Sequence, residues 1–230
     1  MTHDGKGERI QLADVTVHRD GTRILDGVDL DIRARRIAVI GENGSGKSTF
    51  ARLLNGLLTP TRGRVTVHGL DTVRDGTELR RRAGFVFTDP QAQILMPTPR
   101  EDLALSLRSL PPAEAARRVA ETLAEHGLSD RADAPAAELS GGQKQLLALA
   151  AVLITGPALL IADEPTTLLD LRNARRIGDL LLSQPAQLVV ITHDLELAAR
   201  CDVALLFHEG RLVAQDEPAA VLHAYRMQCA

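Results

Sequence analysis

The stretch Gly41-Glu42-Asn43-Gly44-Ser45-Gly46-Lys47-Ser48 matches the spacing G-x-x-x-x-G-K-[ST]. An apolar run typical of a buried strand precedes it, at residues 37–40, and a segment that predicts a helix follows it, at residues 49–54. In this context the glycines let backbone N–H groups turn toward an anion, and the helix N-terminus adds partial positive charge. A glycine-rich turn before an ordinary helix would not require Lys and then Ser at these offsets. The stretch therefore predicts a phosphate-binding loop for a nucleoside triphosphate.

Two side chains of this loop have predicted roles. Lys47 is expected to reach the β- and γ-phosphates, and the Ser48 hydroxyl is expected to ligate Mg²⁺.

Composition excludes several classes of protein. The chain has 230 residues, 44% of them hydrophobic, which is enough for a sizeable core. Only 2% are aromatic and the net charge is -3, so neither base stacking nor a basic surface points to nucleic acid. The longest apolar run, residues 146–154, is far shorter than the roughly 18 residues that a membrane span needs.

Strands and helices are expected to alternate along the chain. Two strands joined by the turn signal Asp20-Gly21 should form a small antiparallel sheet beside the phosphate-loop strand. After the central part of the chain, apolar strands alternate with helices, which favours a parallel sheet covered on both faces. The strands are expected at residues 10–17, 28–32, 64–69, 85–87, 158–162, 188–191 and 203–207, and late helices at residues 172–182 and 195–200.

Helical periodicity dominates the middle of the chain. Residues 100–126 have a helical pattern with a break at Pro111-Pro112, and a further helix is expected to begin at Ser140. We therefore expect a helical unit at residues 89–156, inserted into a core made of residues 1–88 and 157–230.

Two carboxylates end an apolar strand at Asp163-Glu164. The C-terminal ends of parallel strands converge on the ligand crevice, where the phosphate loop also lies. Asp163 is expected to hold Mg²⁺, directly or through water, and Glu164 to polarise the attacking water as a general base. Two exposed carboxylates opening a turn before Pro165 are the alternative, but the strand is too apolar for that ending.

A second helix start carries glycines, in Leu139-Ser140-Gly141-Gly142-Gln143. A serine cap followed by free N–H groups forms a second anion site, although a plain N-cap is the commoner explanation of such a sequence read alone.

Together these motifs resemble those of the ATPase subunits of ABC transporters. The set comprises Gly41–Ser48, Ser140–Gln143, Asp163-Glu164, Asp170 and Thr192-His193-Asp194, and the resemblance covers essentially the whole chain. It implies an α/β fold: a RecA-like P-loop NTPase core with an N-terminal antiparallel β-subdomain and an inserted α-helical subdomain.

The resemblance also implies how the motifs are used. ATP would lie between the phosphate loop of one copy, Thr49 included, and Ser140, Gly141, Gly142 and Gln143 of another. Glu164 would be the catalytic base, Asp170 would lie in the dimer-contacting loop, and His193 would contact the γ-phosphate. A lone histidine after a strand is more often a cap or core residue, but in this context the switch role is favoured.

Two positions depart from the family pattern. Thr88 stands where a Gln usually touches Mg²⁺ and the lytic water, and its shorter side chain offers one oxygen with less reach; Gln91 and Gln93 lie nearby but not at that position. Arg19 stands where an aromatic residue usually stacks on adenine. Because a guanidinium stacks on π faces, weak base affinity with little selectivity is expected there.

The segment from Phe87 to Thr98 resembles the ATPase subunits of energy-coupling factor (ECF) transporters. Thr88, together with the run from Glu164 to Asn173, resembles the biotin-type members of that branch. This implies a second ATPase subunit, identical or a sister chain, a transmembrane T component and a substrate-binding S component that takes biotin, another vitamin or a metal ion. The chain would then lie on the cytoplasmic face of the membrane as a peripheral subunit. Ile94, Leu95 and Met96 line a groove for the T component or belong to the core, and the sequence favours neither.

A soluble ATPase of the same family, acting without a transporter, is the alternative. Such proteins usually carry tandem cassettes or long coiled insertions, and this chain has neither.

Overall fold

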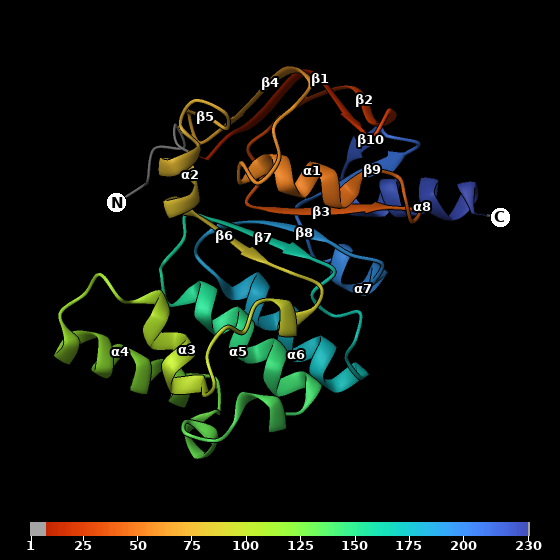
Figure 1. Ribbon diagram of the computed structural model, residues 1–230. Coiled ribbons are helices and arrows are strands. Elements are labelled where there is room, and N and C mark those ends of the chain that lie inside the picture. Colours follow the sequence, from red (N-terminus) through yellow and green to blue (C-terminus); the bar gives the residue numbers. More distant parts are fainter. Residues whose placement is uncertain (1–7, 230) are drawn as a thin grey trace, which may run out of the picture.

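The computed structural model describes residues 8–229, and it contains two β-sheets with helices on both sides of the larger one (Figure 1). The larger sheet has six strands in the order β10-β9-β3-β8-β7-β6. All neighbours in it are parallel except β9 and β10. Its strands are β3 (Arg36–Gly41), β6 (Ala83–Val86), β7 (Leu159–Asp163), β8 (Gln187–Ile191), β9 (Val203–His208) and β10 (Arg211–Asp216).

The smaller sheet is antiparallel, with strand order β2-β1-β4-β5. It consists of β1 (Ile10–Arg19), β2 (Thr22–Ile32), β4 (Arg62–Val67) and β5 (Leu70–Asp71). Figure 1 shows it above helix α1 (Lys47–Leu54), which lies between it and the large sheet.

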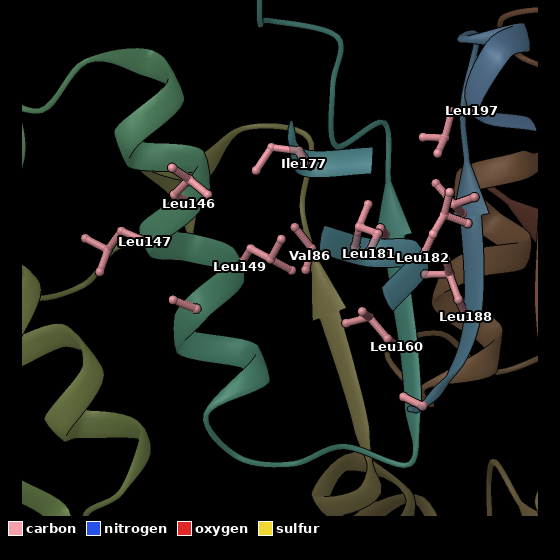
Figure 2. Packing of buried hydrophobic residues seen from close by; sticks show 14 of the residues in the cluster. Val86, Leu146, Leu147, Leu149, Leu160, Ile177, Leu181, Leu182, Leu188 and Leu197 are labelled. Carbon is pink, nitrogen blue, oxygen red and sulfur yellow. The ribbon is translucent and has the colours of Figure 1, made fainter. Parts of the chain in front are cut away.

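The parallel strands send alternate side chains into two cores, as the twofold period of a strand requires. Ile37 and Val39 of β3 pack with Phe50 of α1 and with the antiparallel sheet. Ala38 and Ile40 face the opposite side, toward the helices. Figure 2 shows that second core, where leucines from β7 and β8 meet those of two long helices, α5 (Gly141–Leu153) and α6 (Leu171–Ser183). All five residues of β7 are buried, as expected for a strand covered on both faces.

The remaining helices fall into two groups. Between β6 and β7 lie α3 (Pro99–Ser106), α4 (Pro112–Glu125) and α5, with 3₁₀ turns at Pro90–Ala92, Ser129–Arg131 and Ala136–Glu138. Elsewhere lie α2 (Gly76–Arg82), α6, α7 (Leu195–Ala198) and α8 (Pro218–Gln228). The expected break at Pro111-Pro112 separates α3 from α4. The division at residues 89 and 156 stays a prediction, and the first seven residues of the predicted core lie outside the described range.

The α/β prediction is confirmed, but several elements differ from expectation. β2 begins at Thr22 rather than at residue 28, because the hairpin continues through register shifts near Val15 and Val17. β4 runs from Arg62 and ends at Val67, before residue 69. The elements α2, β10 and α8 were not predicted. Within residues 8–229 no helix is long and apolar enough to cross a membrane.

Candidate functional site

The loop between β3 and α1 has the backbone shape of an anion cradle. Gly44 has φ 81° and Gly46 has φ 98°, the left-handed region that glycine adopts without steric cost. A Cβ on Gly46 would lie 2.6 Å from Leu25 Cδ2. The loop therefore depends on glycine at Gly46 both for conformation and for space, and it leads directly into the N-terminus of α1.

Lys47 places a positive charge at the centre of this loop. Its side chain is buried, and Nζ donates hydrogen bonds of 2.7 Å to the carbonyl oxygens of Gly41 and Glu42. Burial lowers the pKa of Lys47, and the nearby charges of Glu164, Asp163 and Glu42 act in the opposite direction. The ammonium group is thus held beside the loop by carbonyl oxygens that an anionic ligand can replace as partners.

Ser45 supplies a further test of anion binding. Its Oγ is buried and has no hydrogen-bond partner among the described residues. A buried hydroxyl without a partner is costly, and a phosphate oxygen at this loop would accept its hydrogen bond. The residues present therefore fit a phosphate group.

The Ser48 and Asp163 side chains meet at the edge of the large sheet. Ser48 Oγ donates a 3.0 Å hydrogen bond to Asp163 Oδ1, and Thr88 Oγ1 donates one of 2.9 Å to the backbone oxygen of Asp163. Burial raises the pKa of Asp163, against which the hydrogen bond from Ser48 and the charges of Arg52 and Lys47 act. Oxygen ligands of this kind suit Mg²⁺, which is commonly shared between one or two protein oxygens and substrate phosphates.

Glu164 follows Asp163 and is held at both carboxylate oxygens. Oε1 lies 3.0 Å from Nε2 of His193, and Oε2 accepts a 2.8 Å hydrogen bond from the Thr167 hydroxyl. Nε2 of His193 is also 3.1 Å from Oδ1 of Asn43 in the phosphate loop. Because both neighbours are acceptors, Nε2 carries the hydrogen. Glu164 has φ 53°, an uncommon conformation that costs a non-glycine residue about 1 kcal/mol.

Several of these residues line one cleft, and Asp163 and His193 are hydrogen-bonded to its lining residues Ser48 and Glu164. The cleft has a volume of 280 Å³, and its walls include Gly44, Lys47, Ser48 and Glu164. The structure thus brings together the predicted residues of the phosphate loop, Asp163, Glu164, His193 and Thr88. Their individual roles stay predictions.

The start of α5 forms a second, separate group. Ser140 caps the helix, with its Oγ accepting from the Gln143 N–H at 3.3 Å and the Gln143 side chain accepting from the Ser140 N–H at 2.9 Å. This is the reciprocal capping box. Ser140 and Gly141 are exposed, and no atom lies within 4 Å of a Cβ built on Gly141. The helix end is therefore open to a ligand or a partner.

Asp170 lies with this second group. It caps α6 by accepting hydrogen bonds from the backbone N–H and the side-chain amide of Asn173, and the backbone hydrogen bond is the main cause that lowers the pKa of Asp170. The Asn173 side chain in turn packs on Gly142, where an added Cβ would lie 2.8 Å from Asn173 Cγ. Gly142 therefore allows the two helix starts to approach closely.

The two groups lie apart in this chain. In Figure 1 the first turn of α5 lies in the lower, helical part of the molecule, away from the loop between β3 and α1. Among the hydrogen bonds of the described residues, none joins Ser140–Gln143 to the phosphate loop. One chain thus contains two helix starts that are predicted to bind anions, and they do not share a cleft.

Arg19 lies beyond the phosphate cleft, on a neighbouring cleft of 390 Å³. Sequence reasoning did not identify Thr167 as the second partner of Glu164, nor Asn43 as the partner of His193. Thr167 follows Glu164 by three residues, the spacing of a turn, which is the one signal that pointed to it.

The sequence and the structure also resemble those of known proteins. The sequence profile of the ABC transporter family matches residues 25–167, more than half of the chain, and this range includes the phosphate loop, Ser140–Gln143 and Asp163-Glu164. The chain belongs to the ABC transporter ATP-binding family. Members of this family bind and hydrolyse ATP, so the chain is an ATPase.

Relatives within the ABC family include transport ATPases of named systems. The biotin transport ATP-binding protein BioM of Rhizobium etli is 50% identical over 203 residues, covering 87% of this chain and 90% of BioM. The energy-coupling factor transporter ATP-binding protein EcfA1 of Halalkalibacterium halodurans is 35% identical over 226 residues, covering 95% of this chain and 81% of EcfA1. The structure of cbiO1 from Clostridium perfringens, part of the ABC transporter complex cbiONQ, superimposes with a TM-score of 0.84 and 31% identity, covering 96% and 94% of the two chains.

Proposed function

We propose that this ABC ATPase is the ATP-hydrolysing subunit of an ECF-type importer that takes up biotin, another vitamin or a metal ion. The observation that carries the proposal is the likeness to BioM, EcfA1 and cbiO1 over nearly the full length of each. In this proposal the chain is a peripheral subunit on the cytoplasmic face of the membrane and works with T and S components.

The catalytic step uses the cleft beside the phosphate loop. Lys47 and the loop N–H groups bind the phosphates, and Ser48 and Asp163 hold Mg²⁺ with Thr88 beside them. The metal supplies electrostatic stabilisation of the phosphate oxygens. Glu164 accepts a proton from the attacking water, and the hydrogen bonds from His193 and Thr167 fix its carboxylate in one orientation.

A second ATPase subunit completes the site. The exposed, glycine-containing start of α5 has N–H groups available to phosphate but has no Lys47 or Asp163 beside it. Pairing with another copy, or with a sister subunit, brings Ser140–Gln143 of one protomer onto the nucleotide of the other. Asp170, which is linked to Gly142 through Asn173, then lies at the contact between subunits.

A groove in the helical part supports the proposed contact with the T component. Its volume is 710 Å³, and it is lined by Ile94, Leu95 and Met96 on one side and by Pro135 and Ala136 among others. Ile94 packs against the core, whereas Leu95 is 71% exposed at the edge of the groove. An exposed leucine at the edge of an apolar groove suits a short helix from the T component.

Detergent extraction of membranes from cells that express the tagged chain tests the proposal. We expect the chain to co-purify with at least one multi-span membrane protein, and Leu95→Asp to reduce that recovery. Val73→Asp, at another exposed apolar side chain, serves as the matched control. If the chain stays in the soluble fraction and retains its ATPase activity, the soluble alternative replaces the transport function. Loss of uptake of one vitamin or metal ion on deletion of the chain identifies the substrate.

A further inference from the structure

A cleft of 490 Å³ lies between helices α4, α5 and α6 and has no part in the proposed function. None of the residues that line it also lines the phosphate cleft or the groove proposed for the T component. Its apolar wall consists of Leu146, Leu153, Ile154 and Leu180. Clefts of about 300–1,000 Å³ that combine apolar walls with a few polar groups are typical of small-molecule sites.

One wall of this cleft contains a buried histidine with an unused nitrogen. His126 is 7% exposed, and its Nδ1 lies 2.9 Å from the carbonyl oxygen of Thr122, one turn earlier on α4. Because a carbonyl oxygen only accepts, Nδ1 carries the hydrogen, and Nε2 of the neutral ring is an acceptor. Nε2 is buried and has no hydrogen-bond partner among the described residues. Since buried polar atoms are seldom left without a partner, the ring suits a ligand that donates a hydrogen bond.

Two guanidinium groups line the same cleft without a carboxylate partner. Arg118 Nη2 donates a 2.5 Å hydrogen bond to the carbonyl oxygen of Ile154, at the end of α5. Arg176 Nη2 on α6 donates one of 2.9 Å to the carbonyl oxygen of His126, at the end of α4. Among residues 8–229 neither arginine has an Asp or Glu oxygen within 4.0 Å. A guanidinium has five N–H donors, so both groups keep donors for a carboxylate ligand.

Two carboxylates in the walls limit which anion can enter. Glu121 accepts hydrogen bonds of 2.7 and 2.9 Å from Arg117, which lies outside the cleft, whereas Glu125 forms no ion pair within the described part of the chain. The charge of Glu125 repels a polyanion such as phosphate but accepts a hydrogen bond from an N–H group. The walls therefore favour a ligand with a single negative group and a donor.

We propose that this cleft binds a small apolar molecule that carries one carboxylate and one hydrogen-bond donor. The carboxylate contacts Arg118 and Arg176, the donor faces His126 or Glu125, and the apolar body packs against the leucine-rich wall. Apolar amino acids such as leucine and cyclic urea carboxylates such as biotin share this chemistry. The binding site does not depend on the proposed transport function.

A ligand in this cleft acts on the two helices that begin at the proposed contact between subunits. Helix α5 is capped by Ser140 and helix α6 by Asp170. The hydrogen bonds of Arg118 and Arg176 join α4 to the ends or sides of these helices, and a carboxylate competes for the same guanidinium groups. We therefore expect a bound ligand to lower the rate of ATP hydrolysis by about fivefold, an expectation that rests on the proposed pairing of subunits.

Calorimetric titration of the purified chain with leucine and with biotin tests the site. We expect at least one of them to bind with a Kd below about 1 mM, and leucine alone or biotin alone would identify which source fits. The amide of the bound compound, which lacks the negative charge, should bind at least about tenfold more weakly. Arg176→Gln should weaken binding of the acid by about tenfold, whereas Arg175→Gln, next to it on α6 but outside the cleft, should bind like the wild type.

Absence of binding by both compounds would overturn the proposal, and equal binding of acid and amide would overturn the role of the guanidinium groups. The comparison of acid with amide uses the wild-type chain, so it decides the question even if Arg176→Gln does not fold. Phosphate release measured with the bound compound present tests the effect on hydrolysis, and an unchanged rate would overturn that effect. These results leave the transport function intact, because the cleft shares no lining residue with the phosphate cleft or the T-component groove.

Discussion

The two glycine-containing helix starts of this chain, at α1 and at α5, differ in how much of a site each one contains. The start of α1 has a buried lysine, glycines at positive φ and a neighbouring strand end that supplies Asp163 and Glu164. The start of α5 has a capping box and an exposed surface, and its glycines have ordinary helical backbone. In the proposed function, the same local feature, a helix N-terminus, supplies most of a site in one place and half of a site in the other. The residues around a helix start, rather than the helix start itself, therefore decide what it can bind.

The largest effect is expected at the first helix start. Lys47→Met keeps most of the buried stem but removes the ammonium group, so we expect ATP hydrolysis to fall at least about a hundredfold, together with ATP affinity. Phosphate release and nucleotide titration measure the two quantities, and circular dichroism verifies the fold. A folded variant that hydrolyses ATP at the wild-type rate would contradict the phosphate site at α1.

The second helix start should behave differently. In Ser140→Asp the carboxylate caps the helix as well as serine does, so the free energy of unfolding should change by less than about 0.5 kcal/mol. ATP binding to one chain should persist, whereas hydrolysis should fall about a hundredfold, because the new charge repels the nucleotide of the other subunit. Ser140→Ala is the control, expected to lose about 1 kcal/mol of stability. If Ser140→Asp weakened ATP binding by the isolated chain, the two helix starts would share one site.

Glycine substitutions at the two helix starts should change the free energy of unfolding in opposite directions. Gly46→Ala should lower the free energy of unfolding by about 1–3 kcal/mol, because its φ is 98° and the new Cβ meets Leu25. Gly141→Ala should raise it by up to about 1 kcal/mol, since the position is helical and open. Urea unfolding of the two variants measures both changes in the free energy of unfolding. Destabilisation by Gly141→Ala would contradict the open helix start.

The smallest effect concerns pH. The pKa of Asp163 is raised in the folded chain, mainly by burial, so its contribution to stability is present below the ordinary value of 3.8 and is lost as pH rises through the folded pKa. Asp163→Asn removes this dependence, so the variant should gain stability relative to the wild type as pH increases above 3.8, while hydrolysis is lost. Urea unfolding at a series of pH values measures the free energy of unfolding of the variant and of the wild type. If the variant instead lost stability relative to the wild type as pH increases, the neighbours of Asp163 would stabilise its charged form.

Much of the fold was predictable where the sequence pattern has one physical cause. The strand before Gly41 and the strand ending at Asp163 are continuous apolar runs because both faces are covered. Helix α2 was missed because Leu79 is its one buried apolar side chain, which leaves no periodicity to detect. Strand β10 was missed because it is an edge strand with no fully buried residue.

The site was predictable to the extent that its residues belong to local motifs. The contacts of Glu164 with His193 and of His193 with Asn43 join residues far apart in the chain, and no local spacing reveals them. Their geometry depends on the strand order, which places β8 between β3 and β7.

The mass of the Glu164→Gln chain in solution, measured by light scattering with and without Mg²⁺ and ATP, tests the proposed composite site most directly. Without the carboxylate, bound ATP is not consumed, so we expect the 24.8 kDa chain to double its mass when ATP is added. The double variant Glu164→Gln, Ser140→Asp should bind ATP and keep the mass of one chain. A Glu164→Gln chain that stays monomeric with ATP bound, or a double variant that pairs equally well, would contradict a nucleotide held between two subunits.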